Sequence, residues 1–402
     1  MIYIPLESFV REGDFGAFLA AELSSVRVPI LIGDQRVLQS VAVRDANPCV
    51  YIDKSLAKNK SKWYSNLPES LFLISHDLEF TGVYRGVDYI VQRFGEVGSS
   101  RVDKVVFHDR YELRSVLAVR PDLPALGALG SWYFESLVSL RTRRHKEILE
   151  ARDKFGADFI FVPSNFGGFF HSEGVASFGA WIFKHFPELD SADQFRSKII
   201  SREKERMLFV DALISLAQSN SKKTFVLRPH PTETELAWSV FPFPNNVVIS
   251  KSFTTAIMTA ASSLVIHNCC TTVIDANVLD VPQLVLKTSS SQDSWPFWSY
   301  INAKIDVLIQ QDWSLDAINL NGSERIEIGS VCCELSKLIN DMHLNNSLRS
   351  TFGIALLTVL KSWLLVDTGK FSKADTKTLA RELNCLIKNR SVVNLGRAVL
   401  IL

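Results

Sequence analysis

The sequence alternates short apolar runs with segments whose apolar residues recur at helical spacing, and this alternation occurs in two series. Such alternation predicts parallel β-strands joined by helices that cover both faces of a sheet. The strands of the first series are expected over 2–6, 28–33, 49–53, 71–77 and 104–109. Those of the second are expected over 158–168, 224–229, 246–250, 263–267 and 283–287. We therefore predict an α/β protein with two Rossmann-like, doubly wound lobes.

A predicted helix over 135–156, which Gly156 would end, separates the two series. We place the first lobe at 1–155 and the second at 156–320. From about residue 320 the apolar spacing is helical, so we expect C-terminal helices over 321–402 that pack back on the lobes. The length of 402 residues suits two domains better than one core.

Charge and composition argue against several classes of protein. The formal net charge is +1 at pH 7, so the protein as a whole has no strong positive potential that would attract nucleic acid. Charges at Glu7, Arg11 and Asp14 interrupt the region where a signal peptide would be apolar. The apolar run 353–366 contains Lys361 and is shorter than the ~20 residues of a membrane span. We expect a cytoplasmic protein that does not bind nucleic acid.

The sequence gives little support for a metal or a tightly bound cofactor. Its six cysteines include two adjacent pairs but no C-x-x-C spacing. No convincing Asp-x-Asp motif follows a predicted strand. The phosphate loop G-x-x-x-x-G-K-[ST] is absent, and no G-x-G-x-x-G follows a strand. We therefore expect neither a metal site nor a resident cofactor.

Polar residues follow most of the predicted strands. Ligands of doubly wound sheets bind at the carboxyl ends of the strands, so these residues are the first candidates for a site. They are Glu7, Asp34, His76, Asp77, His108, Asn165, His230 and Asn268.

The segment TFVLRPHPTETE, at 224–235, ends an apolar run in Arg228, Pro229, His230 and Pro231. Pro231 suits the first turn of a following helix, whose free N–H groups would favour an anion. Arg228 and His230 could add hydrogen-bond donors for a phosphate. A proline-bounded turn with a locally satisfied histidine explains the same residues, so both interpretations are kept.

A second segment, 263–286, has the pattern of strand, polar turn, helix and strand. The turn after Asn268 opens the helix, and the hydroxyls of Thr271 and Thr272 could hold a phosphate together with exposed N–H groups. Thr272 and Asp275 also have the spacing of a capping box, in which the helix itself would occupy both side chains. The two interpretations can coexist.

Several motifs resemble those of a known family. RPHPTE (228–233), VVIS (247–250) and VLDVPQLVL (278–286) resemble the C-terminal lobe of bacterial glycosyltransferases with the two-lobed GT-B fold. Among these are the capsule and lipopolysaccharide Kdo transferases and the CDP-glycerol glycerophosphotransferases. IYIPLESFVREGDFGAFLAAEL (2–23), VYIDKSL (50–56) and FVPSNFGG (161–168) more specifically resemble the surface carbohydrate biosynthesis family. The Gln-Pro-Glu motif of capsule Kdo transferases has no clear match here.

The resemblance implies a GT-B fold with an interlobe cleft and a glycosyltransferase of surface polysaccharide synthesis, for lipopolysaccharide O-antigen or capsule. Because no Asp-x-Asp motif follows a predicted strand, we expect the nucleotide to depart without the help of a metal ion. Such an enzyme transfers a sugar from a nucleotide sugar to a glycan or lipid-linked acceptor, at the inner face of the cytoplasmic membrane. Kdo from CMP-Kdo is the favoured donor. A sugar-nucleotide epimerase of the same fold, a polyol-phosphate transferase and a non-catalytic pathway protein are the alternatives.

This chemistry suggests roles for the candidate residues. We expect Glu7 as the base and His230 as a second catalytic group; Glu7 can instead pair with Arg11 at i+4. The residues expected at the nucleotide are Arg228, Asn268, Thr271, Thr272 and Asp275, and those expected to position substrates are Arg11 and Asn165. Asn165 can equally stabilise its own turn.

A basic loop is a further candidate. It contains Lys54, Lys58, Lys60 and Lys62, and it can attract an anionic acceptor or a membrane surface, or can be simply solvated.

Overall fold

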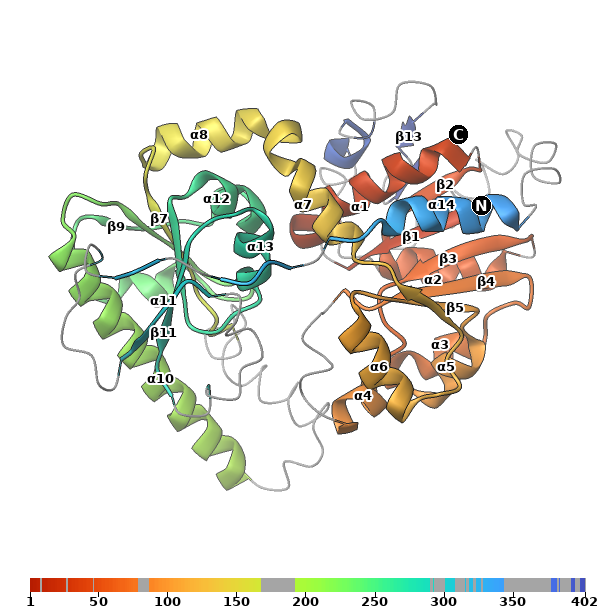
Figure 1. The fold of residues 1–402 in the computed structure, drawn as a ribbon, viewed down its shortest axis with the longest axis horizontal. Helices are drawn as coiled ribbons and strands as arrows, with labels where there is room; N and C mark the ends of the chain where they lie inside the picture. Colours follow the sequence, from red (N-terminus) through yellow and green to blue (C-terminus); the bar gives the residue numbers. More distant parts are fainter. Residues whose placement is uncertain are drawn as a thin grey trace. The chain divides into compact units, whose positions relative to one another are not determined.

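The protein is represented by a computed structural model, which divides into two compact units. The first comprises Met1–Ser136 with Glu327–Leu402, and the second comprises Leu137–Ile326. The structure describes residues 1–7, 9–26, 28–45, 47–78, 87–167, 192–289, 292, 301–307, 315, 318–320, 323–326, 328–342, 377–381, 383, 392–394 and 398–401. In each unit a largely parallel sheet lies between helices (Figure 1).

The first unit contains a sheet with the strand order β13-β14-β2-β1-β3-β4-β5-β6. Its strands are β1 (Ile2–Leu6), β2 (Ile30–Asp34), β3 (Cys49–Asp53), β4 (Leu71–His76), β5 (Lys104–Phe107), β6 (Ala125–Ala128), β13 (Val392–Asn394) and β14 (Ala398–Ile401). The strands from β1 to β6 pair in parallel, whereas β14 pairs antiparallel with β2 and with β13. The helices of this part are α1 (Phe9–Leu23), α2 (Gln35–Arg44), α3 (Ser61–Tyr64), α4 (Val87–Arg93), α5 (Glu96–Arg101), α6 (Arg110–Val119) and α14 (Val331–Asp341). The helix α7 (Trp132–Arg143) begins in the first unit and continues into the second from Leu137.

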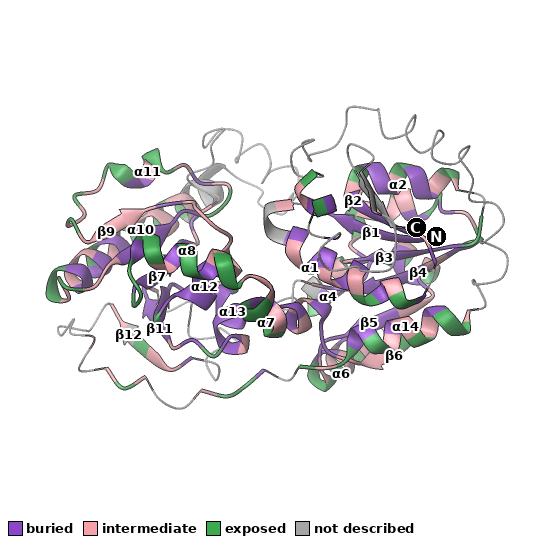
Figure 2. Cartoon of the chain, turned by 90° about the horizontal axis from the view of Figure 1, so that it is seen from above, coloured by how far each residue is buried: buried purple, intermediate pink, exposed green. Residues whose placement is uncertain are grey.

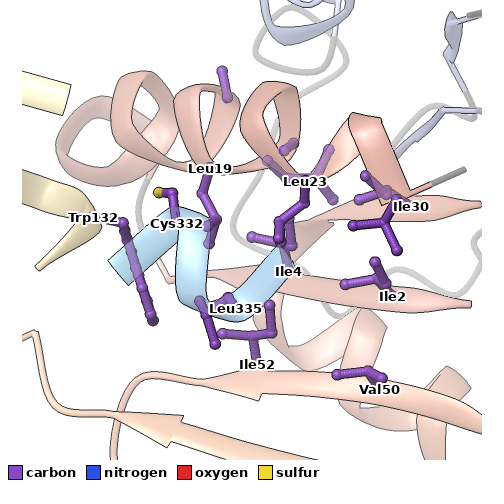
Figure 3. Packing of buried hydrophobic residues seen from close by; sticks show 14 of the residues in the cluster. Ile2, Ile4, Leu19, Leu23, Ile30, Val50, Ile52, Trp132, Cys332 and Leu335 are labelled. Atoms are coloured by element: carbon purple, nitrogen blue, oxygen red, sulfur yellow. The ribbon is translucent and has the colours of Figure 1, made fainter. Parts of the chain in front are cut away.

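Alternate side chains of these strands enter two separate cores. Ile2 and Ile4 of β1 pack with Leu19 of α1 and Leu335 of α14 on one face (Figure 3). Tyr3, which lies between them in the strand, packs on the other face with residues of α2. Strands buried on both faces in this way are typical of parallel sheets, and Figure 2 shows them buried beneath helices that expose their outer sides.

The second unit has the strand order β12-β11-β10-β7-β8-β9, with all neighbours parallel. Its strands are β7 (Ile160–Pro163), β8 (Phe225–Arg228), β9 (Val247–Ile249), β10 (Leu264–His267), β11 (Gln283–Lys287) and β12 (Ala303–Asp306). Its helices are α8 (His145–Phe155), α10 (Ala192–Ser219), α11 (Leu236–Ser239), α12 (Thr255–Ala261) and α13 (Thr272–Val278). Ile160 and Val162 pack against α10, and α12 and α13 cover the opposite face (Figure 1).

The two strand orders determine where polar loops gather. In the first unit the connections diverge between β1 and β3, and in the second they diverge between β7 and β10. Ligands of doubly wound sheets bind in the crevice outside the carboxyl ends of such a strand pair. The predicted pair of doubly wound lobes is confirmed, and each has one such position.

The structure differs from the expected elements in three places. The helix expected over 135–156 is two helices, α7 and α8, and α8 belongs to the second unit because it packs on α12. The region 321–402, expected to be helical, also contributes β13 and β14, since the apolar C-terminal run pairs with the edge of β2. The run 353–366 lies outside the described residues.

Within the described part of the chain, no helix has both the length and the apolarity to cross a membrane.

We expect Gly130→Ala to destabilise the first unit more than Gly127→Ala. Both glycines have positive φ, +91° and +149°, so alanine is strained at either position, at a cost of ~1–3 kcal/mol. Only at Gly130 would a Cβ meet backbone, at 2.4 Å from the nitrogen of Gly329; at Gly127 the nearest atom is a side-chain carbon of Leu129 at 3.4 Å. Urea unfolding of both variants measures the difference. Equal losses would contradict the close approach of the two backbone segments.

Candidate functional site

The exits of β7 and β10 meet at the carboxyl edge of the second sheet. The side-chain nitrogen of Asn165, two residues after β7, donates to the carbonyl oxygen of Cys269 at 3.3 Å. Cys269 has a φ of +58°, so the backbone turns sharply directly after Asn268. Asn165 therefore ties together the two strand exits between which the connections diverge.

Asn268 provides the strongest evidence for a ligand-binding site at this edge. It follows β10 directly and is only 1% exposed. Neither its amide oxygen nor its amide nitrogen has a hydrogen-bond partner among the described residues. Buried side-chain amides are nearly always paired, because an unpaired one forfeits its hydrogen bonds to water.

A buried carboxylate, Glu233, holds the exits of β7 and β8 together. It is 1% exposed and accepts hydrogen bonds from four donors. Its Oε1 accepts from the Phe166 backbone N–H at 2.8 Å, and its Oε2 accepts from the Trp238 indole at 2.7 Å, from the His230 backbone N–H at 3.1 Å and from the Ser164 hydroxyl. This role of Glu233 was not predicted from the sequence. The only available signal was a glutamate three residues after the histidine of RPHP.

The imidazole of His230 is fixed by the same loops. Its Nδ1 lies 2.8 Å from the hydroxyl oxygen of Thr232, which also lies 3.0 Å from the carbonyl oxygen of Gly167. A Cβ on Gly167 would come within 2.4 Å of that Nδ1, so only glycine allows this approach. The residue His230 is exposed, and its ring is therefore both oriented and accessible.

Arg228, the last residue of β8, carries a buried positive charge. It is 7% exposed, and its guanidinium donates to the carbonyl oxygen of Ser252 at 3.1 Å. Burial lowers the pKa of Arg228 to about 10, so the group is still a cation at neutral pH. No carboxylate forms an ion pair with it in the described part of the chain. Buried charges are normally paired, so this one is available to an anion.

The helix start expected at Pro231 and the capping box expected in α13 are both wrong. Residues 231–235 form a turn, and the four-residue helix α11 begins only at Leu236, so Pro231 does not open a helix beside His230. The reason is that Glu233 turns back to bind the loop after β7. In α13 the N-cap residue is Thr271, without a side-chain capping bond, and Thr272 is already the first helical residue, so Thr272 and Asp275 do not form the expected capping box.

The remaining residues of that segment lie where the sequence placed them. Thr272 opens α13 and is 8% exposed, and Asp275 is 5% exposed one turn later. Their role at a nucleotide, together with that of Thr271, stays a prediction.

The diverging strand pair of the first unit carries a different kind of cluster. The ammonium group of Lys54, directly after β3, lies 2.6 Å from Glu7 Oε2 and 2.6 Å from Glu12 Oε1. The Glu7 side chain is 46% exposed, whereas Glu12 is buried. Glu7 thus pairs with Lys54; the side chain of Arg11, the other expected partner, lies outside the described residues.

The basic loop is only partly solvated. Lys60 binds the fully buried carboxylate of Asp53 at 2.7 Å, and the same carboxylate accepts from the Tyr64 hydroxyl at 2.8 Å. Lys58 and Lys62 are exposed. The interpretation as a simply solvated loop is therefore wrong for Lys54 and Lys60, which pair with the carboxylates of Glu7 and Asp53 at strand ends.

The other strand-end candidates have structural partners. Asp34 caps α2 by accepting from the Arg36 backbone N–H at 2.9 Å, and Asp77 pairs with Arg93 through a 2.6 Å bond to Nε. His108 lies 3.0 Å from Glu112.

His76 is completely buried against Trp132, and burial lowers its pKa well below the usual range.

Among the described residues, no group of three or more His, Cys, Asp or Glu could hold a metal ion.

The sequence matches no protein-family model and no curated protein. Its fold is similar to that of the Methanocaldococcus jannaschii UDP-GlcNAc 2-epimerase in complex with UDP-GlcNAc and UDP, with a TM-score of 0.54 and 7% identity over 85% of this chain and 99% of that chain. A candidate UDP-N-acetylglucosamine 2-epimerase of Listeria monocytogenes gives a TM-score of 0.51 and 10% identity over 87% of this chain and 98% of that one. The wall teichoic acid polymerase TagF, as its H548A variant, gives 0.40 and 10% identity over 86% and 89%. The first two likenesses show a fold of the GT-B type.

We expect Glu233→Ala to lower the free energy of unfolding by about 3 kcal/mol or more, because four donors lose their acceptor and each buried unsatisfied group costs ~1–3 kcal/mol. The control is Glu235→Ala in the same segment. Glu235 is exposed and accepts one bond, from the Lys251 backbone N–H at 2.8 Å, so its loss should cost about 1 kcal/mol or less. Chemical unfolding measures both. Similar losses would show that Glu233 does not hold the two exits.

Proposed function

We propose that the chain is a GT-B glycosyltransferase that binds a nucleotide sugar at the carboxyl edge of the second unit. The observation that carries this proposal is Asn268, a buried amide with neither polar atom paired among the described residues, at the strand pair where ligands of such sheets bind. A phosphate would accept from the amide nitrogen, and a sugar hydroxyl would donate to the amide oxygen.

Two residues at the end of β8, on the same edge of this sheet, support an anionic ligand. Arg228 contributes a buried cation without an ion pair in the described part of the chain, and His230 contributes an oriented ring one strand away from β7. In glycosyl transfer the nucleotide leaves with negative charge on its phosphate, and preorganised donors stabilise that charge. The M. jannaschii protein of similar fold is bound to UDP-GlcNAc and UDP, which supports the same class of ligand.

The first unit bears on the choice between transfer and epimerisation. An epimerase needs at least two acid and base groups that exchange protons with the sugar. The buried carboxylates described near this edge are occupied: Glu12 pairs with Lys54, Asp53 pairs with Lys60, and Asp34 caps α2. Glu7 also pairs with Lys54, but its side chain is 46% exposed. Transfer needs one base for the acceptor hydroxyl, and the exposed Glu7 is the group we assign to it, with Arg11 and Asn165 positioning substrates.

The motif resemblance suggests the pathway and the donor. RPHPTE and its neighbours point to surface polysaccharide synthesis, with a glycan or lipid-linked acceptor at the inner face of the membrane. We favour a CMP-activated acidic sugar such as Kdo, because its carboxylate and its phosphate both require donors such as Arg228 and His230.

Incubation with CMP-, UDP- and GDP-sugars and separation of the products by mass tests this function. We expect release of nucleotide together with transfer of the sugar to an acceptor. An altered sugar formed without any acceptor would identify an epimerase, and no turnover with any donor would identify a non-catalytic protein.

Dissociation constants of CMP, UDP and GDP test the donor. If UDP or GDP binds at least ~10-fold more tightly than CMP, about 1.4 kcal/mol, the CMP preference is wrong.

The same assays on His230→Ala locate the site. Loss of a charge-assisted hydrogen bond, ~1.5–3 kcal/mol, should lower nucleotide affinity or kcat/KM by roughly 10- to 100-fold. The thermal midpoint should not change, because the His230 side chain is exposed. His145→Ala, which removes another exposed histidine of the second unit, should have no effect on either quantity. Unchanged kinetics in His230→Ala would contradict the placement of His230 in the nucleotide site.

A further inference from the structure

A cluster of positive charge that includes Arg228 extends the proposed site at the ends of β8 and β9. Its centre is Ser252, in the loop that follows β9. The carbonyl oxygen of Ser252 accepts from Arg228 at 3.1 Å, and its hydroxyl oxygen accepts from the Lys154 ammonium at 2.8 Å. The Ser250 hydroxyl donates to the same oxygen at 3.0 Å.

A third cation joins the cluster to the turn that carries His230. The ammonium of Lys251 donates to the carbonyl oxygen of Glu233, and it lies 3.4 Å from that of Pro231. The β8 and β9 exits therefore share three cationic side chains, and the hydrogen bonds connect them through backbone carbonyls and serine hydroxyls.

None of these three cations forms an ion pair with a carboxylate of the described residues. The carboxylate of Glu235 accepts from the Lys251 backbone N–H, and its charge raises the pKa of Arg228 less than burial lowers it. Some other cations of this unit do have a carboxylate partner, as Lys223 has in Asp158 and Lys287 in Asp306. Three like charges held together without a counter-charge repel one another, so a bound anion would stabilise the arrangement.

We propose that Lys154, Arg228 and Lys251, with the hydroxyls of Ser250 and Ser252, form a phosphate-binding subsite. Phosphate fits this set better than a carboxylate because it presents three or four acceptor oxygens to donors that arrive from several directions. The subsite itself does not depend on the proposed function. Its place in catalysis does, and it supplies contacts for a phosphate beyond the one at Asn268.

Two substrates would bring such a phosphate. One is the β-phosphate of a nucleoside diphosphate sugar, and the other is the phosphate of an acceptor when the donor is a CMP-sugar. In the first case a nucleoside diphosphate binds more tightly than the monophosphate, and free phosphate competes with the diphosphate. In the second case free phosphate binds equally well when the protein is saturated with CMP.

The experiment measures binding of inorganic phosphate, CMP, CDP, UMP and UDP to the full chain by calorimetry. In Lys154→Met and Ser252→Ala we expect the affinity for phosphate to fall at least ~10-fold, about 1.4 kcal/mol. Lys222→Met, which removes an exposed lysine before β8, should bind phosphate like the wild type. Arg228→Met should lose phosphate binding while keeping or raising the unfolding midpoint, because it removes an unpaired buried charge.

No phosphate binding by the wild type, or equal losses in Lys154→Met and Lys222→Met, would overturn the subsite. Failure of the proposed function looks different: phosphate would bind and respond to the variants as expected, but no nucleotide would bind.

Discussion

Helices cover both faces of the two parallel sheets, and this burial confines polar chemistry to the ends of the strands. Inside the sheets, successive residues of β1 enter opposite cores, as Ile2 and Tyr3 do. A charged side chain can therefore be accommodated only where a strand ends and a loop begins. The strand orders then select one position at each sheet's carboxyl edge, between β1 and β3 and between β7 and β10.

The carboxyl edges of the two sheets differ in how their buried carboxylates are neutralised. At the edge of the first unit, Lys54 and Lys60 neutralise the buried carboxylates of Glu12 and Asp53. At the edge of the second unit, the carboxylate of Glu233 is occupied by neutral donors. Arg228 consequently lacks an ion-pair partner among the described residues. This difference is the electrostatic basis for placing an anionic ligand on the second unit, since a cation that the fold leaves without a counter-charge gains most from a phosphate.

The helices and strands were predicted well from the sequence, because the spacing of apolar residues follows which side chains are buried. The strands at 2–6, 49–53 and 283–287 were predicted with their observed bounds. Asn268 was predicted as a strand-end residue, but its unpaired amide depends on which loops pack around it. The bond from Asn165 to Cys269 joins residues 104 positions apart, which no local pattern encodes. The helix expected at Pro231 failed for the same reason, because the distant loop after β7 binds Glu233.

Hydrogen–deuterium exchange with and without saturating nucleotide tests the central claim most directly, since it locates the ligand without assuming its identity. We predict slower exchange in 164–167, 228–233 and 268–272 of the second unit. Protection confined to the loops that carry Glu7 and Lys54 in the first unit, with none in these three segments, would contradict the account.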